Sequence, residues 1–268
     1  MFTEAELLRL ADGNLAEFAR EHARWLPPTR IEEHADLLLT ACGSRFPAGV
    51  WNCALPLSAG SLTTDSASEA LERAQHFFGG LARRFSMYAR AHRDAALARL
   101  CESQGWARLA DTPGMVLAQP IAEPPLPAGL RVQRVESEDD ARDFVQIMAS
   151  AYERMLLPAA VTTKLFAQPQ RWLAPHCVAL TLCDDGKARA GALALFSHGI
   201  AGIYWVGTAP DAERRGYART LVRALGNLAF ERGARAVILQ ASPYGEPVYR
   251  RLGYREFTRY ALYLSPER

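Results

Sequence analysis

The stretch Val206-Gly207-Thr208-Ala209-Pro210-Asp211-Ala212-Glu213-Arg214-Arg215-Gly216-Tyr217-Ala218 decides how the second half of this chain folds. The apolar run ending at Gly207 predicts a strand, the proline turns the chain, and a basic loop enters a helix with apolar residues every three or four positions. The first N–H groups of a helix are unpaired and carry partial positive charge, so they suit an anion. Gly216 permits close approach of a ligand, and Arg214 and Arg215 add charges that match phosphate oxygens.

These residues alone also fit an arginine-rich surface loop in front of a helix, so both interpretations are open at this point. The phosphate-loop pattern G-x-x-x-x-G-K-[ST] is absent from the sequence, and so is the dinucleotide-binding pattern G-x-G-x-x-G. If the stretch binds an anion, it therefore does so in another way than these two motifs.

Helices and strands alternate along both halves of the chain. In the first half we expect helices from Thr3, over 15–25, from Ser66 and over 94–103, with strands over 37–41, 50–57, 85–89 and two runs ending at Leu117. In the second half we expect strands over 130–135, 178–182, 190–196, 203–207, 236–239, 255–258 and 261–264, with helices from Ser137, after Pro158, from Gly216 and over 248–252. The mixture predicts an α/β (α+β) fold.

A proline-rich segment, residues 120–128, lies between the two halves. Because prolines fix φ and lack an N–H, we expect an extended and semi-stiff connector there. Each half ends in the same way, with a helix, a strand, a short helix, a Gly-aromatic pair and closing strands; the pairs are Gly105-Trp106 and Gly253-Tyr254. The sequence thus indicates an internal duplication, with domains at 1–119 and 129–268.

The bulk properties narrow the class of protein. The chain has 268 residues, 31 basic and 29 acidic, so no overall field favours nucleic acid or a membrane surface. We see no signal peptide and no apolar run long enough to span a bilayer. Five scattered cysteines and six dispersed histidines form no metal-binding pattern, and we expect a cytoplasmic protein with free thiols and no metal.

Two segments of the second half resemble the GNAT superfamily of N-acetyltransferases. The first is the quoted stretch, in which V-x-x-x-P is followed by a basic R-x-x-G-x-G/A turn that opens a helix. The second, Glu246 to Tyr254, is similar to the family's A-x-x-L-Y-x-x-x-G-F segment. The resemblance implies two GNAT-like domains in tandem, each with a mixed, mostly antiparallel central sheet flanked by helices. The second is of the active type, and the first, with no arginine in its corresponding loop, is degenerate.

The resemblance also implies a co-substrate and its contacts. Acetyl-CoA would be held by backbone groups at the end of the central strand and by the loop and helix start. The implied residues are Val206, Gly207, Thr208, Arg214, Arg215, Gly216, Tyr217, Ala218 and Arg219, with Gln240 and Ser242 at the end of the following strand. The sequence departs from the family at Glu213, which stands at the first basic position of the motif, so weaker or rearranged binding is expected.

The implied reaction is acetyl transfer to a primary amine of a small molecule or peptide by direct attack. Tyr249 matches the tyrosine that protonates the departing thiolate in many family members; a buried structural tyrosine is the alternative. The general base is open, with Glu153 and His198 as candidates. A catalytically silent acyl-CoA-binding or partner-binding module is the alternative function, and the sequence leaves the acceptor and the oligomeric state open.

Overall fold

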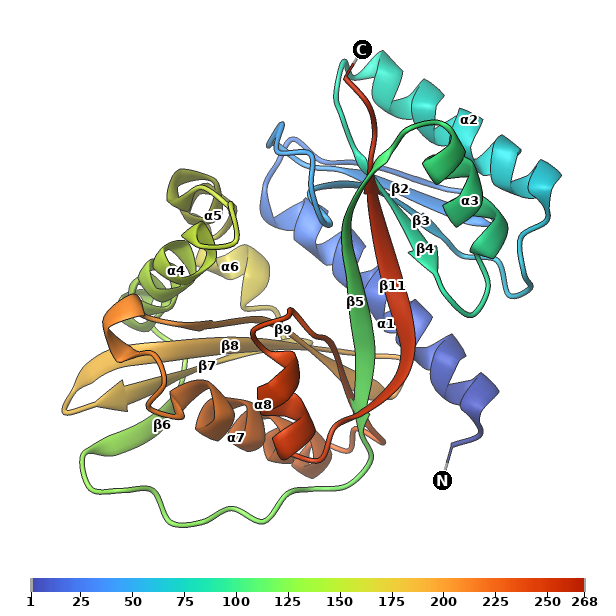
Figure 1. Cartoon of the computed structure of the whole chain (residues 1–268). Helices are drawn as coiled ribbons and strands as arrows, with labels where there is room; N and C mark the ends of the chain where they lie inside the picture. Colours follow the sequence, from blue (N-terminus) through green and yellow to red (C-terminus); the bar gives the residue numbers. More distant parts are fainter. Residues whose placement is uncertain (1, 268) are drawn as a thin grey trace. The chain divides into compact units, whose positions relative to one another are not determined.

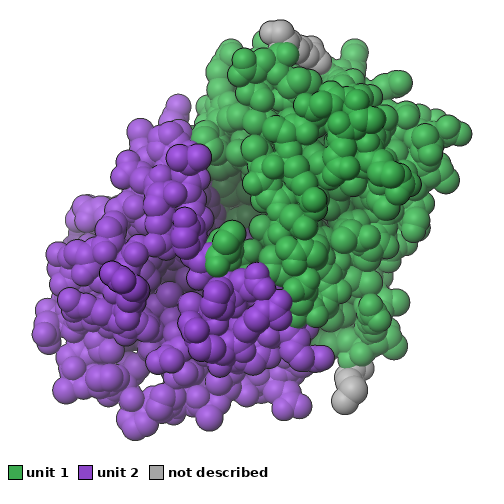
Figure 2. Space-filling model, in the orientation of Figure 1, with its two compact units in different colours: residues 1–114, 240–243, 256–268 green, residues 115–239, 244–255 purple. Residues whose placement is uncertain are grey.

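A computed structural model gives the structure of the chain and describes residues 2–267. The helices and strands are labelled in Figure 1. The chain forms two compact units, coloured separately in Figure 2. Unit 1 contains residues 1–114, 240–243 and 256–268, and unit 2 contains residues 115–239 and 244–255.

Unit 1 is a sheet with helices on both faces (Figure 1). Its strands follow the order β1-β2-β3-β4-β11, with the first part of β5 next to β11. Helices α2 and α3 pack on one face through a core that includes Leu39, Met87 and Phe78, and helix α1 contacts β2 and β3. The elements are α1 (Glu4–Trp25), β1 (Arg30–Glu33), β2 (Leu37–Ala41), β3 (Asn52–Pro56), α2 (Thr64–Gly80), β4 (Ser86–Arg90), α3 (Ala95–Ser103), β5 (Ala107–Leu117) and β11 (Arg255–Leu264).

Three expectations for the first half differ from the structure. One continuous helix, α1, replaces the two predicted helices, because the buried positions before and after Gly13 lie on one face and packing outweighs the low helix propensity of glycine. Helix α2 begins earlier than expected, since Thr63 and not Ser66 is its N-cap and the two side chains form a reciprocal capping box. The short exposed strand β1 was not predicted, because its sequence is almost entirely polar.

Unit 2 has the same kind of architecture. Its strands follow the order β10-β9-β8-β7-β6, with the last residues of β5 next to β10. Strands β9 and β10 are parallel and joined through helix α7, whereas the pairs β6–β7, β7–β8 and β8–β9 are antiparallel. The elements are β6 (Leu130–Arg134), α4 (Glu138–Glu153), α5 (Ala159–Leu165), α6 (Pro169–Trp172), β7 (Cys177–Asp184), β8 (Lys187–Ser197), β9 (Ile200–Thr208), α7 (Tyr217–Glu231), β10 (Val237–Gln240) and α8 (Glu246–Arg251).

The fold class predicted from the sequence is therefore confirmed. Each unit is a mixed, mostly antiparallel sheet flanked by helices, and each contains a parallel pair joined by a helix, β3–β4 in unit 1 and β9–β10 in unit 2. The predicted cap of α4 at Ser137 is present, and α7 begins directly after Gly216, as expected. Helix α6 was not predicted, and the two closing runs at the C-terminus form one strand, β11.

Each unit contains a strand segment from the other half of the sequence. Strand β11 pairs with β4, with Ala261 opposite Ala89, and so completes unit 1. In return, Met115–Leu117 belong to unit 2, where Leu117 lies beside Gly226 and Gly253. The units thus divide the chain differently from the predicted domains 1–119 and 129–268, which stay a prediction about evolutionary repeats.

The proline-rich segment has neither helix nor strand between residues 118 and 129. It is nevertheless anchored, because the Asn227 side chain accepts a hydrogen bond from the Ile121 N–H and donates one to the Ile121 carbonyl, both at 2.8 Å. In the described part of the chain, no helix is long and apolar enough to cross a membrane.

Candidate active site

A bulge in β9 opens the backbone immediately before the stretch quoted above. The register with β8 shifts between Gly191 and Leu193, and Trp205 has φ of +52°, a left-handed conformation that is strained for a bulky side chain. On the other edge of β9, the pairing with β10 runs from Ala201 to Ile203 and goes no further among the described residues. The last residues of β9 therefore offer backbone groups to a ligand.

Helix α4 packs closely against this end of β9. A Cβ atom added at Gly207 would lie 3.0 Å from both the Ala151 Cβ and the Met148 Cε, so the glycine permits the approach of the helix. The Tyr152 ring lies 4.7 Å from the Trp205 ring, and Phe166 lies 5.0 Å from Trp205 on another side. The bulge is thus bordered by aromatic side chains.

Tyr152 connects the bulge with the predicted general acid. Burial raises the pKa of Tyr152, and the nearby Tyr249 hydroxyl raises it further. The Arg154 charge and a hydrogen bond from the Val206 backbone N–H oppose these effects and lower the Tyr152 pKa. Because both Val206 and Tyr249 affect the Tyr152 pKa, these three residues lie close to one another.

Tyr249 sits on α8 with its ring held in place. A Cβ at Gly245 would lie 2.6 Å from that ring, so only glycine fits one turn earlier, and the Tyr254 ring is 5.9 Å away. Tyr249 is 7% exposed, and burial raises its pKa above the ordinary value of 10. The phenol therefore keeps its proton at neutral pH, as a proton donor must.

The N-terminus of α7 is open in a way that the other long helices are not. Side chains cap α1, α2 and α4, whereas α7 begins after Gly216, which has φ of +83° and no side chain to cap with. The first bond of the helix runs from the Thr220 N–H to the Gly216 carbonyl at 3.0 Å, so the amides of residues 217–219 precede it. These amides suit an anion.

The side chains around this N-terminus are fixed or exposed. The Tyr217 hydroxyl donates to Asp184 of β7 at 2.5 Å, so only the backbone of Tyr217 is free to meet a ligand. Arg214, with φ of +62°, and Arg219 are exposed, and Arg215 lies 3.8 Å from Asp184. Ala218 leaves the first turn uncrowded.

Glu213, which departs from the family pattern, is paired. Its carboxylate accepts a hydrogen bond from the Arg154 guanidinium, which also lies 5.0 Å over the Tyr244 ring. Asp211 of the same loop pairs with Arg189 of β8 at 2.7 Å. The acidic charges of the loop are therefore neutralised by arginines from elsewhere in unit 2.

Not every residue predicted to contact the cofactor lies at the β9 bulge or the start of α7. Val206 and Gly207 lie at the bulge, and Thr208 ends β9 opposite Ala190 of β8. Gln240 and Ser242 fall in the segment 240–243, which is counted with unit 1, and the Ala241 N–H donates to the Pro113 carbonyl at 2.9 Å. They are not grouped with the unit 2 residues.

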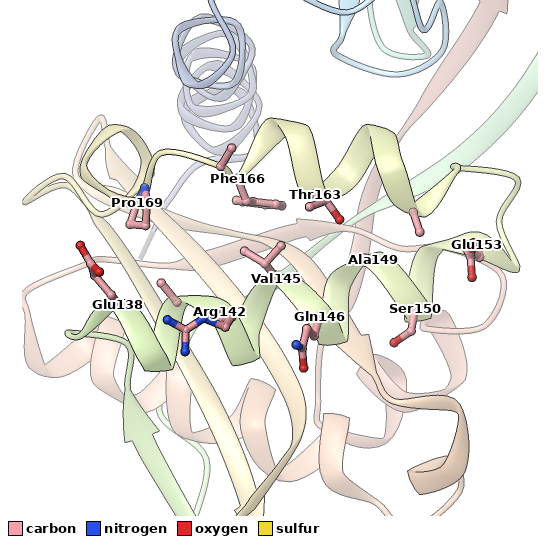
Figure 3. A pocket seen from close by; sticks show the side chains of 13 residues that line it. Glu138, Arg142, Val145, Gln146, Ala149, Ser150, Glu153, Thr163, Phe166 and Pro169 are labelled. Atoms are coloured by element: carbon pink, nitrogen blue, oxygen red, sulfur yellow. The ribbon is translucent and has the colours of Figure 1, made fainter.

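The two candidate bases lie elsewhere. His198 occupies the β8–β9 turn, at the opposite end of β9 from the bulge, about 25 Å of extended chain from Val206. Glu153 lines a groove of about 650 Å³ between α4 and the α5–α6 segment (Figure 3). Phe166 lines this groove and also contacts Trp205, so it forms the wall between the groove and the bulge.

Sequence reasoning missed Trp205 as part of the site, and it gave no individual role to Tyr152 or Arg154, although the segment 151–166 that contains them is expected to shape the acceptor cleft. The first two depend on the bulge and on the end of α4, and no local pattern predicts either. The only signal for Arg154 in the sequence is indirect: the acidic Glu213 in a basic loop implies a basic partner elsewhere in the chain. Among the described residues, no group of three or more acidic, histidine or cysteine side chains is arranged to hold a metal ion.

Comparisons with known proteins bear on the fold of the chain. Residues 142–254 match the acetyltransferase (GNAT) family. The structure is similar to a GCN5-related N-acetyltransferase from Kribbella flavida, with a TM-score of 0.72, 19% identity and 94% of this chain and 96% of the other covered. It is also similar to a GCN5-related N-acetyltransferase from Sphaerobacter thermophilus, with a TM-score of 0.64, 17% identity and coverages of 87% and 81%.

A third similar structure bears on the duplication. It is a tandem GNAT protein from the clavulanic acid biosynthesis pathway, with a TM-score of 0.60, 13% identity and coverages of 96% and 97%. No curated protein matches the sequence. Residues 142–254 thus match the acetyltransferase (GNAT) family, and the fold of the chain is similar to that of a tandem GNAT protein.

Proposed function

We propose that this protein transfers an acetyl group from acetyl-CoA to a primary amine. The observation that carries the proposal is the combination, within unit 2, of the opened β9 bulge, the uncapped α7 N-terminus and the buried, protonated Tyr249. The three features supply what such a reaction needs: backbone groups for the thioester arm, an anion site for the pyrophosphate, and a proton donor.

The cofactor contacts follow from the same features. The backbone of residues 206–208 would hold the pantetheine arm, because the end of β9 is open on the β10 side. The pyrophosphate would lie at the start of α7, on amides of residues 214–219, with Arg214 and Arg215 adding charge. Gln240 and Ser242 remain weaker candidates for contacts.

The chemistry is a direct displacement at the thioester carbonyl. The amine nitrogen, once deprotonated, attacks the carbonyl carbon, and a backbone N–H near the end of β9 would stabilise the developing oxyanion. The carbon–sulfur bond then breaks and the thiolate takes the proton of Tyr249. The attacking nitrogen gives up its extra proton to solvent, and Tyr249 takes a proton back from solvent. A thiol pKa near 8.5 makes this departure fairly easy, so the acid contributes at the lower end of general acid catalysis.

The pairing of Glu213 supports activity over the silent alternative. An uncompensated carboxylate would repel the pyrophosphate, but the Arg154 guanidinium already neutralises it. A silent acyl-CoA-binding module would bind the thioester without releasing thiol.

We propose that unit 1 has an architectural role. Helix α2, which corresponds in its place after β3 to α7 after β9, is closed at its N-terminus by the Thr63–Ser66 capping box. Its loop carries no arginine. The unit also holds β11, the strand that follows directly after α8 and Tyr249.

Free-thiol release from acetyl-CoA in the presence of a panel of primary amines tests the proposal. We expect release that depends on both the protein and the amine, with the acetylated amine found by mass spectrometry. Affinity for acetyl-CoA without release for any amine would favour the silent module.

A further inference from the structure

Two large apolar side chains of unit 2 are unusually exposed. Leu156 is 87% exposed and Tyr244 is 62% exposed, whereas the other exposed large apolar residues in the described chain, Leu109 and Leu126, reach 44% and 37%. Exposing such side chains gives up hydrophobic stabilisation in proportion to the apolar surface, and a ligand that covers them recovers it.

Both residues stand beside the reaction site. Leu156 follows Tyr152 by four residues, in the turn after α4, and its φ of +62° is uncommon for a branched side chain. Tyr244 comes directly before Gly245, which packs against the Tyr249 ring. The two segments that flank the site thus each present one apolar side chain to solvent.

Arg154 joins these two segments. It lies two residues before Leu156, its guanidinium lies 5.0 Å over the Tyr244 ring, and it donates a hydrogen bond to Glu213. We call Arg154, Leu156 and Tyr244 the rim. Leu156 and Tyr244 therefore belong to one local surface, within the reach of a single arginine side chain.

The charge of the rim is already satisfied. The Arg154 guanidinium is shared between a carboxylate and an aromatic ring, so an anionic ligand would have to displace Glu213 to pair with it. Inside the rim, Tyr152, Trp205 and Phe166 border the bulge with aromatic surface. The rim thus offers apolar contact, and its one arginine, Arg154, is already engaged by Glu213.

We propose that the acceptor is a primary amine with an apolar, aromatic-sized body and without a carboxylate, and that Leu156 and Tyr244 cover this body. The proposal rests on the proposed function, because it places the acceptor beside Tyr249. It excludes free amino acids and short polar polyamines as preferred substrates.

Three matched amines test the substrate class: 2-phenylethylamine, phenylalanine and 1,4-diaminobutane. The first two differ by the carboxylate, and the third lacks the apolar body. We expect kcat/KM for 2-phenylethylamine to exceed the other two values by at least about tenfold, the low end of what apolar complementarity gives. A preference for phenylalanine or for 1,4-diaminobutane overturns the proposal.

Variants locate the contact. Leu156→Ser and Tyr244→Ser should each raise KM for 2-phenylethylamine by roughly three- to tenfold, from the lost apolar area. The same variants should leave KM for 1,4-diaminobutane and the affinity for acetyl-CoA unchanged. Leu109→Ser, in unit 1, is the matched control and should change nothing. Equal effects on both amines, or no effect, would contradict the assignment.

Direct binding separates this inference from the proposed function. Saturation-transfer NMR with 2-phenylethylamine and the wild-type protein should show binding that weakens in Leu156→Ser and Tyr244→Ser but not in Leu109→Ser. Calorimetry with acetyl-CoA reports on the proposed function instead. If acetyl-CoA fails to bind and the amine still binds at the rim, the proposed function is wrong and the apolar amine site is supported. If no variant alters amine binding, the inference about the rim is wrong.

Discussion

Replacing Tyr249 by phenylalanine should lower kcat by about 10²-fold and leave the affinity for acetyl-CoA nearly unchanged. The structure sets this magnitude in two ways. The ring of Tyr249 packs against Gly245 and lies near Tyr254, and phenylalanine keeps both contacts, so the fold and the cofactor site should survive. Only the proton donor is removed. The conjugate thiol has a pKa near 8.5, so the thiolate can depart without being protonated, and turnover falls but does not vanish.

Tyr254→Phe is the matched control. Tyr254 is buried beside Tyr249, burial likewise raises its pKa, and its hydroxyl has no hydrogen-bond partner among residues 2–267. Losing that hydroxyl should cost neither activity nor stability. The assay is steady-state thiol release over pH 6.5 to 9.5, with calorimetry for acetyl-CoA.

The pH dependence adds a second test of the same role. Because burial raises the Tyr249 pKa, the wild-type acid stays protonated through pH 9.5, and no loss of kcat on the alkaline side should come from it. Wild-type turnover in Tyr249→Phe, or an equal loss in Tyr254→Phe, would refute the reasoning.

Three further outcomes follow from the packing. Gly207→Val should lower the free energy of unfolding by about 1–3 kcal/mol, measured by urea denaturation, because its side chain meets Met148 and Ala151; an unchanged midpoint would contradict the close approach of α4. A fragment of residues 129–268 should not fold cooperatively by circular dichroism, since β11 pairs with β4 and the fragment lacks Met115–Leu117; a sharp thermal transition would be the opposite result. Burial lowers the pKa of His22 to about 3, so stability that is complete above pH 6.5 should fall as the pH drops below it, and His22→Phe should flatten that loss between pH 6.5 and 4; an unaltered profile would exclude His22 as a cause.

Much of the fold could be predicted from periodicity and caps. The Ser137 cap, the Asp185-Gly186 turn and the start of α7 are local signals, since short-range sterics and hydrogen bonds decide them. The exchange of β5 and β11 between the units could not be predicted, because strand pairing depends on distant segments. For the same reason the closing runs read as separate strands.

The candidate site was predictable only in part. The loop from Glu213 to Ala218 carries its own signal, a glycine and two arginines at a helix start. The bulge at Trp205 is set by the register with β8 and by the packing of α4, which no short motif encodes. The role of Arg154 likewise depends on tertiary structure, since Arg154 and Glu213 are 59 positions apart in the sequence.

The central claim is that the β9 bulge and the start of α7 hold acetyl-CoA. Calorimetric titration of the purified protein with acetyl-CoA, beside the Gly216→Val variant, tests it most directly. Gly216 has φ of +83°, so valine would strain the turn and crowd the pyrophosphate amides. The account predicts micromolar binding in the wild type and at least a tenfold loss in the variant. Absence of binding in the wild type, or equal affinity in both proteins, would contradict it.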